Sequence, residues 1–97
     1  MAHARELYRT ALAVNPDEPD GLVGLGELAR ADGKNTDARA YFEHALIGSP
    51  AYVPALLGLA DTLWDLDNKD LARARYAEVV RRAPLGTYPE RVRNRSQ

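Results

Sequence analysis

Apolar residues recur at helical spacing in successive short stretches of the chain. Leu22, Leu25, Leu28 and Ala29 stand three or four positions apart, which places them on one face of a helix. A second stretch follows the same rule with Ala38, Tyr41, Phe42, Ala45 and Leu46. The pattern predicts an all-α chain built from short amphipathic helices.

These stretches repeat at one fixed spacing, which we call one repeat length. The same spacing separates Pro16 from Pro50 and Pro50 from Pro84. First-helix positions pair as Leu22 with Leu56, Gly24 with Gly58, and Leu25 with Leu59. Second-helix positions align three times, as Ala4/Ala38/Ala72, Arg5/Arg39/Arg73 and Tyr8/Phe42/Tyr76. The repeat predicts two full units at 19–52 and 53–86, preceded by a second helix at 1–18 and followed by a cap or tail at 87–97, all within a single domain 1–97.

The segments between the helical stretches contain residues that are typical of turns and helix ends. "DGKN" at 32–35 offers a glycine for a left-handed helix end and an asparagine that can cap the next helix, and "DLDNKD" at 65–70 offers aspartate and asparagine in the same role. Prolines in "NPDEP", "GSPAY" and "APLGT" stop the second helix of each unit, because proline lacks an amide hydrogen.

The pattern resembles the tetratricopeptide repeat, a helix-turn-helix unit of about 34 residues, which equals the repeat length of this chain. Leu22, Leu25-Gly26 and Ala29 stand at its first-helix positions, and Ala38, Phe42, Ala45 and Pro50 at its second-helix positions; the likeness covers about residues 2–84. The resemblance implies an α-solenoid of antiparallel helix pairs in a right-handed superhelix, with about five helices plus a short C-terminal cap helix.

Size differences along the second helix suggest how the units would lock together. Small residues such as Ala38 and Ala45 let neighbouring helices approach closely, whereas Phe42 fills the gap between one helix pair and the next. We therefore expect Phe42 and its counterparts to act as wedges in the core.

Composition removes several kinds of chemistry. The chain of 97 residues contains no cysteine, which excludes disulfides, thiolate metal sites and a cysteine nucleophile. Its longest charge-free stretch, 45–60, is interrupted by glycine and proline and is too short for a membrane span. The N-terminus carries charges where a signal peptide would be apolar. These features favour a cytoplasmic location.

The polar residues do not form a reaction centre. His3 and His44 fall at different positions of the repeat, and the glycines of "DGLVGLGELA" lie inside a predicted helix without the strand or Lys-Ser/Thr pair of a phosphate loop. Acid pairs such as Asp61 and Asp65 would need an enclosed pocket to act in general acid–base catalysis. We expect no catalytic residue, no metal site and no cofactor, and therefore a non-enzymatic protein.

The family resemblance implies that the first helix of each unit lines a concave groove that binds another protein. Carried onto this sequence, the groove-facing positions are Asp20, Val23, Glu27, Arg30, Leu57, Asp61, Trp64 and Asp65. Five of the eight are charged, and four of these are acidic. Such a groove would favour a peptide or helix that is basic and has one apolar anchor.

Trp64 allows two interpretations. Tryptophan is enriched among binding hot spots, and Trp64 lies off the apolar stripe of its helix, so it could contact a partner. It could equally be covered by the C-terminal segment near Tyr88. Asp61 and Asp65 beside it could hold a partner's arginine or lysine, or form a solvated face.

Other partners are judged from charge and register. Residues 1–68 carry 5 basic and 11 acidic side chains (net −6), and residues 69–97 carry 8 basic and 3 acidic (net +5). The family's carboxylate clamp for chaperone tails is absent, because its positions hold Val23, Gly24, Glu27, Pro54, Gly58 and Asp61. A basic arm could contact nucleic acid, but it lacks interleaved aromatics and the pI is about 6.1, so nucleic acid is disfavoured. The arm consists of Arg81, Arg82, Arg91, Arg93 and Arg95.

Self-association is the remaining alternative. Two full units fall below the three that a stable array usually requires. A missing first helix would leave an apolar side on the N-terminal helix, made of Leu7, Tyr8, Ala11 and Leu12. Either the chain is a piece of a longer protein, or it associates with itself and so covers this side. We expect a homo-oligomer, in which case the protein would be a self-assembling structural element.

Overall fold

The computed structural model describes every residue except 1–5, 8, 11, 14 and 85. Within the described residues it contains the helices α2 (Pro19–Ala31), α3 (Asn35–Gly48), α4 (Val53–Asp65), α5 (Lys69–Arg82) and α6 (Glu90–Arg95), and no strand. The described residues between 6 and 13 are also helical. Of the residues named above, His3, Ala4, Arg5, Tyr8 and Ala11 lie outside the described residues. The all-α prediction is confirmed.

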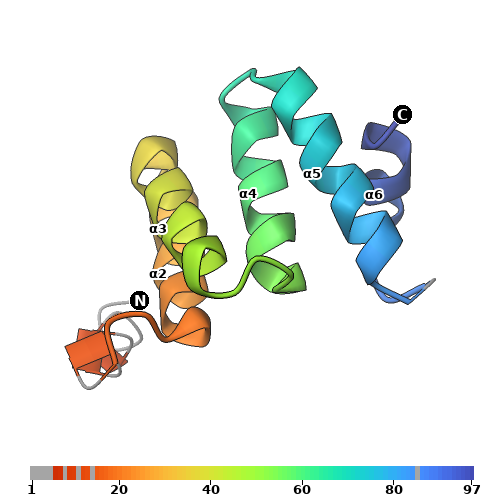
Figure 1. Ribbon diagram of the computed structural model, residues 1–97. Helices are drawn as coiled ribbons and strands as arrows, with labels where there is room; N and C mark the ends of the chain where they lie inside the picture. The colour runs from red at the N-terminus through yellow and green to blue at the C-terminus, as the bar shows by residue number, and fades with distance from the viewer. Residues whose placement is uncertain (1–5, 8, 11, 14, 85) are drawn as a thin grey trace.

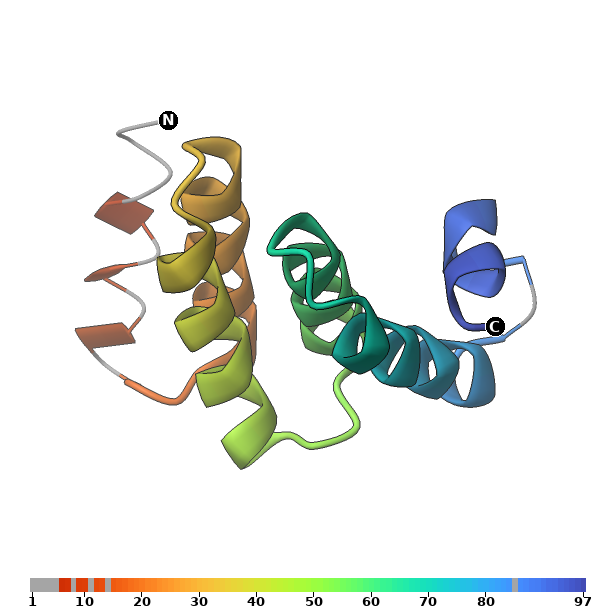
Figure 2. The same cartoon turned by 90° about the horizontal axis from the view of Figure 1, so that it is seen from above.

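The helices form antiparallel pairs that stack on one another. α2 packs on α3 and α4 packs on α5; α3 and α2 both contact α4, and α5 contacts α6 (Figure 1). Viewed from above, the helices follow one another in chain order along a curved row (Figure 2). This arrangement is the predicted α-solenoid of helical repeats, with the short cap helix at its C-terminal end.

The helices of the two full units begin and end at corresponding positions. α4 begins and ends one repeat length after α2, and α5 begins and ends one repeat length after α3. The turn within each unit repeats too, because Gly33 (φ 78°) and Asp67 (φ 61°) both take the left-handed conformation at the same position. The asparagine caps were wrong in detail. Asn35 is already the first residue of α3, and Asn68 precedes α5 without a side-chain capping bond.

Phe42 is the wedge between the two units. Its side chain is fully buried, and a methyl group added to Gly26 would stand 2.7 Å from its Cε1 atom. A methyl group on Gly58 would come closer still to the same atom. Glycine on α2 and glycine on α4 therefore both leave room for the ring of Phe42. Tyr76, one unit later, is equally buried.

The short helix α6 takes the place of a further first helix. Val92 lies one repeat length after Gly58 and is the fully buried residue of α6. Glu90 and Arg93, at the register positions of Leu56 and Leu59, are exposed. α6 thus presents a charged outer face, as expected for a cap.

Within the described ranges, none of the helices has the length and apolar character needed to cross a bilayer.

Candidate functional site

A groove of about 400 Å³ runs between α2, α4 and the segment that leads into α6. Its lining combines apolar and charged side chains. The lining residues are Glu27, Arg30, Phe42, Val53, Pro54, Leu57, Gly58, Asp61, Thr87 and Arg91. We call this surface the concave groove. It contains four of the eight residues expected from the sequence, namely Glu27, Arg30, Leu57 and Asp61.

Asp61 is the centre of a polar network at one end of the concave groove. It is 3% exposed, and Arg91 donates to both carboxylate oxygens, from Nε at 3.1 Å and from Nη2 at 2.7 Å. The Tyr76 hydroxyl donates to Oδ1, and Arg30 Nη1 lies 3.8 Å from Oδ2. Asp61 was expected to face the groove. It lines the groove, but it is buried there and its charge is already satisfied within the chain.

The network shifts the ionisation of its members. Burial alone would raise the pKa of Asp61, but the hydrogen bonds from Arg91 and Tyr76 and the positive charge of Arg91 and Arg30 together lower it. Burial and the bond to the Asp61 carboxylate raise the pKa of Tyr76 to about 12. The same carboxylate raises the pKa of Arg91. Asp61 is therefore held as an anion, which suits an ion pair and not a proton donor.

Trp64 is covered by positive side chains. The Arg95 guanidinium lies 4.4 Å from the indole centroid and the Lys69 ammonium 4.7 Å, while Tyr76 meets the ring edge-on at 6.2 Å between centroids. Arg95 Nη1 also donates to the Tyr76 hydroxyl at 3.0 Å. The C-terminal segment thus covers Trp64, as one of the two interpretations expected, but through Arg95 and not through Tyr88.

The other predicted positions are divided between the surface and the core. The Nε atom of Arg30 donates a hydrogen bond to Asp65 Oδ2 at 3.0 Å, so these two side chains are already paired with each other. Asp20 accepts a hydrogen bond from the Tyr52 hydroxyl. Val23 is only 7% exposed and belongs to the hydrophobic core, so its place on the groove surface is corrected as well.

Glu27 differs from these acids. Its side chain is exposed and lines the concave groove, yet it takes part in no ion pair or hydrogen bond with any residue that the structure describes. Leu57, on the facing helix, is half-buried and lines the same groove. The groove therefore combines apolar side chains with a carboxylate that none of the described side chains occupies.

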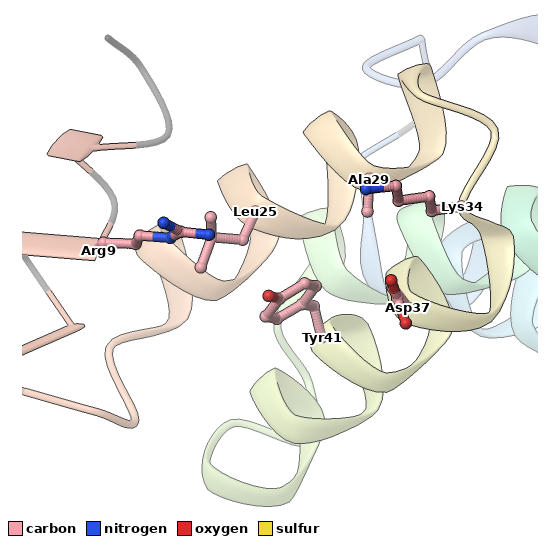
Figure 3. Close-up of a pocket in the computed structure, with 6 residues that line it drawn as sticks. All are labelled: Arg9, Leu25, Ala29, Lys34, Asp37 and Tyr41. Atoms are coloured by element: carbon pink, nitrogen blue, oxygen red, sulfur yellow. The ribbon is translucent and has the colours of Figure 1, made fainter. Parts of the chain in front are cut away.

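A second hollow lies between the N-terminal segment, α2 and α3 (Figure 3). Arg9 extends toward Leu25, and Tyr41 points into the space below it (Figure 3). Its volume is about 140 Å³, and Ala29, Lys34 and Asp37 complete its lining. This hollow is smaller than the concave groove.

His44 lies on the outer side of α3, where its Nε2 atom is 2.8 Å from Asp17 Oδ1. Among the described residues, no group of three His, Asp or Glu side chains could hold a metal ion.

Six residues of the groove lining were not among the predicted groove positions, namely Phe42, Val53, Pro54, Gly58, Thr87 and Arg91. Thr87 and Arg91 are the two that lie outside the two full units. They come from the segment that departs from the apolar pattern of the repeat, where helix periodicity carries little signal. The register contained a clue, because Arg91 stands one repeat length after Leu57, a position already assigned to the groove.

Comparison with known proteins adds the family. A family model described as tetratricopeptide repeat matches residues 29–90, and a second model with the same description matches residues 2–53. The cellulose synthase operon protein C of Komagataeibacter xylinus is 34% identical over 64 residues, covering 62% of this chain and 5% of that protein. The human protein O-mannosyl-transferase TMTC1 is 42% identical over 43 residues, covering 44% of this chain and 5% of that protein. The chain thus spans about one twentieth of the length of these relatives.

Proposed function

The chain belongs to the tetratricopeptide repeat family, and from that premise we propose that it is a non-enzymatic adaptor that binds a peptide or helix of another protein in its concave groove. Tetratricopeptide repeats are protein–protein interaction modules, and a partner protein is what such a surface recognises.

The observation that carries the proposal is the composition of the groove. Apolar side chains, including Val53, Pro54 and Leu57, supply surface whose burial stabilises a complex. Charged groups of the lining can set the orientation of a bound segment. A groove of about 400 Å³ accommodates a few side chains of an extended or helical segment.

The site residues take different parts in this proposal. Glu27, Arg30 and Leu57 contact the partner directly, with Asp20 and Asp65 at the edges. Asp61 and Trp64 hold the wall of the groove, because Arg91 and Arg95 occupy them.

The proposal can be tested by site-specific photo-crosslinking in cells. A photoreactive phenylalanine analogue placed at Leu57 should crosslink to a partner, whereas the same analogue at Ile47, which is 81% exposed on α3, should not. The partner identified by mass spectrometry should then bind the purified chain, and Leu57→Asp should abolish that binding while Ile47→Asp leaves it unchanged. Equal crosslinking from both positions would contradict a groove-directed interaction.

Self-assembly is the second candidate function, favoured by one observation. Leu7, on the N-terminal helical segment, is 58% exposed. We propose that this side can be covered by a second copy, and its test is given in the Discussion.

A further inference from the structure

The repeat presents the same acidic position twice. Glu27 on α2 and Asp61 on α4 stand one repeat length apart, at the same point of their helices, and both line the concave groove. The residues around Glu27 can therefore be compared with the residues at the corresponding positions around Asp61.

Asp61 is the occupied copy. Its carboxylate is bound by the Arg91 guanidinium in a two-pronged arrangement and by the Tyr76 hydroxyl. Both donors come from the parts of the chain that follow α4, and together they satisfy the charge without any partner molecule.

Glu27 is the open copy among the residues that the structure describes. The position that corresponds to Tyr76 is Phe42, which has no hydroxyl, and the position that corresponds to Arg91 is Leu57, which has no charge. Both donors that Asp61 uses are thus replaced by apolar side chains. The nearby Arg30 is already engaged by Asp65 at 3.0 Å and lies 3.8 Å from Asp61.

We propose that Glu27 and Leu57 form a subsite for an arginine side chain of the partner segment, an inference that rests on the groove-binding function proposed above. The guanidinium binds the Glu27 carboxylate as Arg91 binds Asp61, and the aliphatic stem of the arginine lies on Leu57 and Pro54. Arginine suits the subsite because its planar fork binds a carboxylate with two hydrogen bonds, while its stem covers apolar surface.

Charge complementarity supports this occupant. The part of the chain that carries the subsite, residues 1–68, has a net charge of −6. The chain's own basic segment already docks on the acid of the next unit, so the concave face binds guanidinium groups within this molecule. A basic segment would also be drawn to this face before contact.

The test uses short fluorescein-labelled peptides in which one arginine and one leucine stand at varied spacing. Each peptide is paired with a counterpart that carries citrulline, which keeps the shape of arginine but has no charge. By fluorescence anisotropy, the best arginine peptide should bind the full chain about three- to tenfold more tightly than its counterpart, the range for a partly exposed charge-assisted pair. The preference should weaken as salt is raised.

Three variants locate the effect. Glu27→Gln should remove the preference for arginine, and Glu43→Gln, an exposed glutamate on α3, should leave it in place. Leu57→Arg transfers the arrangement of Arg91 and Asp61 to the preceding unit, so the introduced guanidinium should occupy Glu27 and block the arginine peptide. Circular dichroism should show all three variants folded, since each changes a residue that is exposed or half-buried.

The outcomes separate this inference from the proposed function. Equal binding of the arginine and citrulline peptides, or an arginine preference that survives Glu27→Gln, overturns the subsite. If those peptides still lose binding in Leu57→Asp, the groove function stands without it. Peptides that bind Leu57→Asp as well as they bind the wild type, or a panel that does not bind at all, count against both.

Discussion

At the scale of single residues, Phe42 is shared by two repeats. Gly26 on α2 and Gly58 on α4 lie against the same edge of its ring, at atoms Cε1 and Cζ. Protein interiors are packed as tightly as organic crystals, so this contact tolerates neither added nor removed volume. The pair of glycines and the ring therefore form one packing unit, and a change at any of the three should be felt in both repeats.

Removing the ring should be costly. Phe42→Ala should lower the free energy of unfolding by about 3–5 kcal/mol, because it leaves a cavity beside two glycines that cannot fill it. Urea unfolding followed by circular dichroism measures the change. A loss below about 1 kcal/mol would show that the ring does not hold the units together.

Adding a methyl group at the contact should also destabilise. Gly58→Ala should cost about 1–3 kcal/mol through overpacking against Phe42, and Phe42→Leu should recover part of that loss in the double variant. Gly48→Ala is the matched control, because nothing lies within 4 Å of its added methyl group. It should leave stability unchanged or raise it by about 0.4–1 kcal/mol.

The lowered pKa of Asp61 predicts a loss of stability in acid. A carboxyl group whose pKa is lower in the folded chain contributes stability above its unfolded pKa, about 3.9, and that contribution is lost as the pH falls through the folded value. The urea concentration at which half of the wild-type protein is unfolded should therefore decrease as the pH is lowered below about 4. Asp61→Asn should start from a lower midpoint at about pH 7 and show a shallower decline in acid.

The raised pKa of Tyr76 predicts a loss of stability at alkaline pH. Its pKa is raised to about 12 in the folded chain against about 10 in an unfolded one, so the stability it contributes is complete below about pH 10 and is lost between about pH 10 and 12. Tyr76→Phe should flatten this alkaline decline and cost about 1 kcal/mol at neutral pH, where Asp61 loses one donor but keeps Arg91. An unchanged alkaline limb would exclude Tyr76 as its source.

At the scale of elements, α6 is held by polar contacts more than by apolar area. Val92 is its single fully buried residue among those described, whereas Arg91 binds Asp61 and Arg95 lies over Trp64. A helix of six residues has little stability of its own, so its order depends on these contacts. α6 should consequently be the first of the described helices to open.

Trp64 is the only tryptophan in the chain, and its fluorescence should report this opening directly. Arg91→Met keeps most of the aliphatic stem but removes the ion pair, so it should release α6 and change the emission of Trp64 as Arg95 withdraws. Hydrogen exchange should show lost protection in α6 with α2 and α3 unchanged. Arg93→Met, an exposed arginine on the same helix, is the control and should change neither signal.

The helices and their pairing could be predicted from the sequence because they depend on spacing. Leu22 and Leu25 are buried as their periodicity requires, and every helix boundary within one unit recurs in the next. The state of Asp61 could not be predicted in this way. Its burial depends on Arg91, a residue 30 positions away in a segment without the apolar pattern, and ion pairs leave no periodic trace in a sequence. Val23 was misplaced because helical angle alone does not reveal how deeply α2 is packed.

At the scale of the whole molecule, the uneven charge has an internal function. The basic C-terminal part folds back onto the acidic concave face through Arg91 and Arg95, which both approach Asp61. The basic arm considered for nucleic acid is therefore partly engaged within the chain, and Arg82 lies 4.0 Å from Glu78 as well.

Self-association stays a prediction at this scale. Leu7 is exposed on the N-terminal helical segment, whereas Leu12, expected on the same apolar side, is half-buried against the core. Tyr8 and Ala11, the other two residues of that side, lie outside the described residues. Sedimentation equilibrium should show a dimer or larger species whose population grows with concentration, and Leu7→Glu should shift it toward monomer. A monomer at every concentration would remove the structural-element hypothesis and leave the adaptor function untouched.

The residue-for-residue match between the two units has a consequence for how such chains can lengthen. α2 and α4, and α3 and α5, have identical lengths and identical turn positions. Unequal crossing-over between the coding segments of the two units, at any pair of matching codons, would yield a chain with one unit more and with every helix and turn intact. Each added unit would contain its own copy of the acidic position of Glu27 and Asp61. The number of basic side chains that the surface can bind would then increase by gene duplication alone.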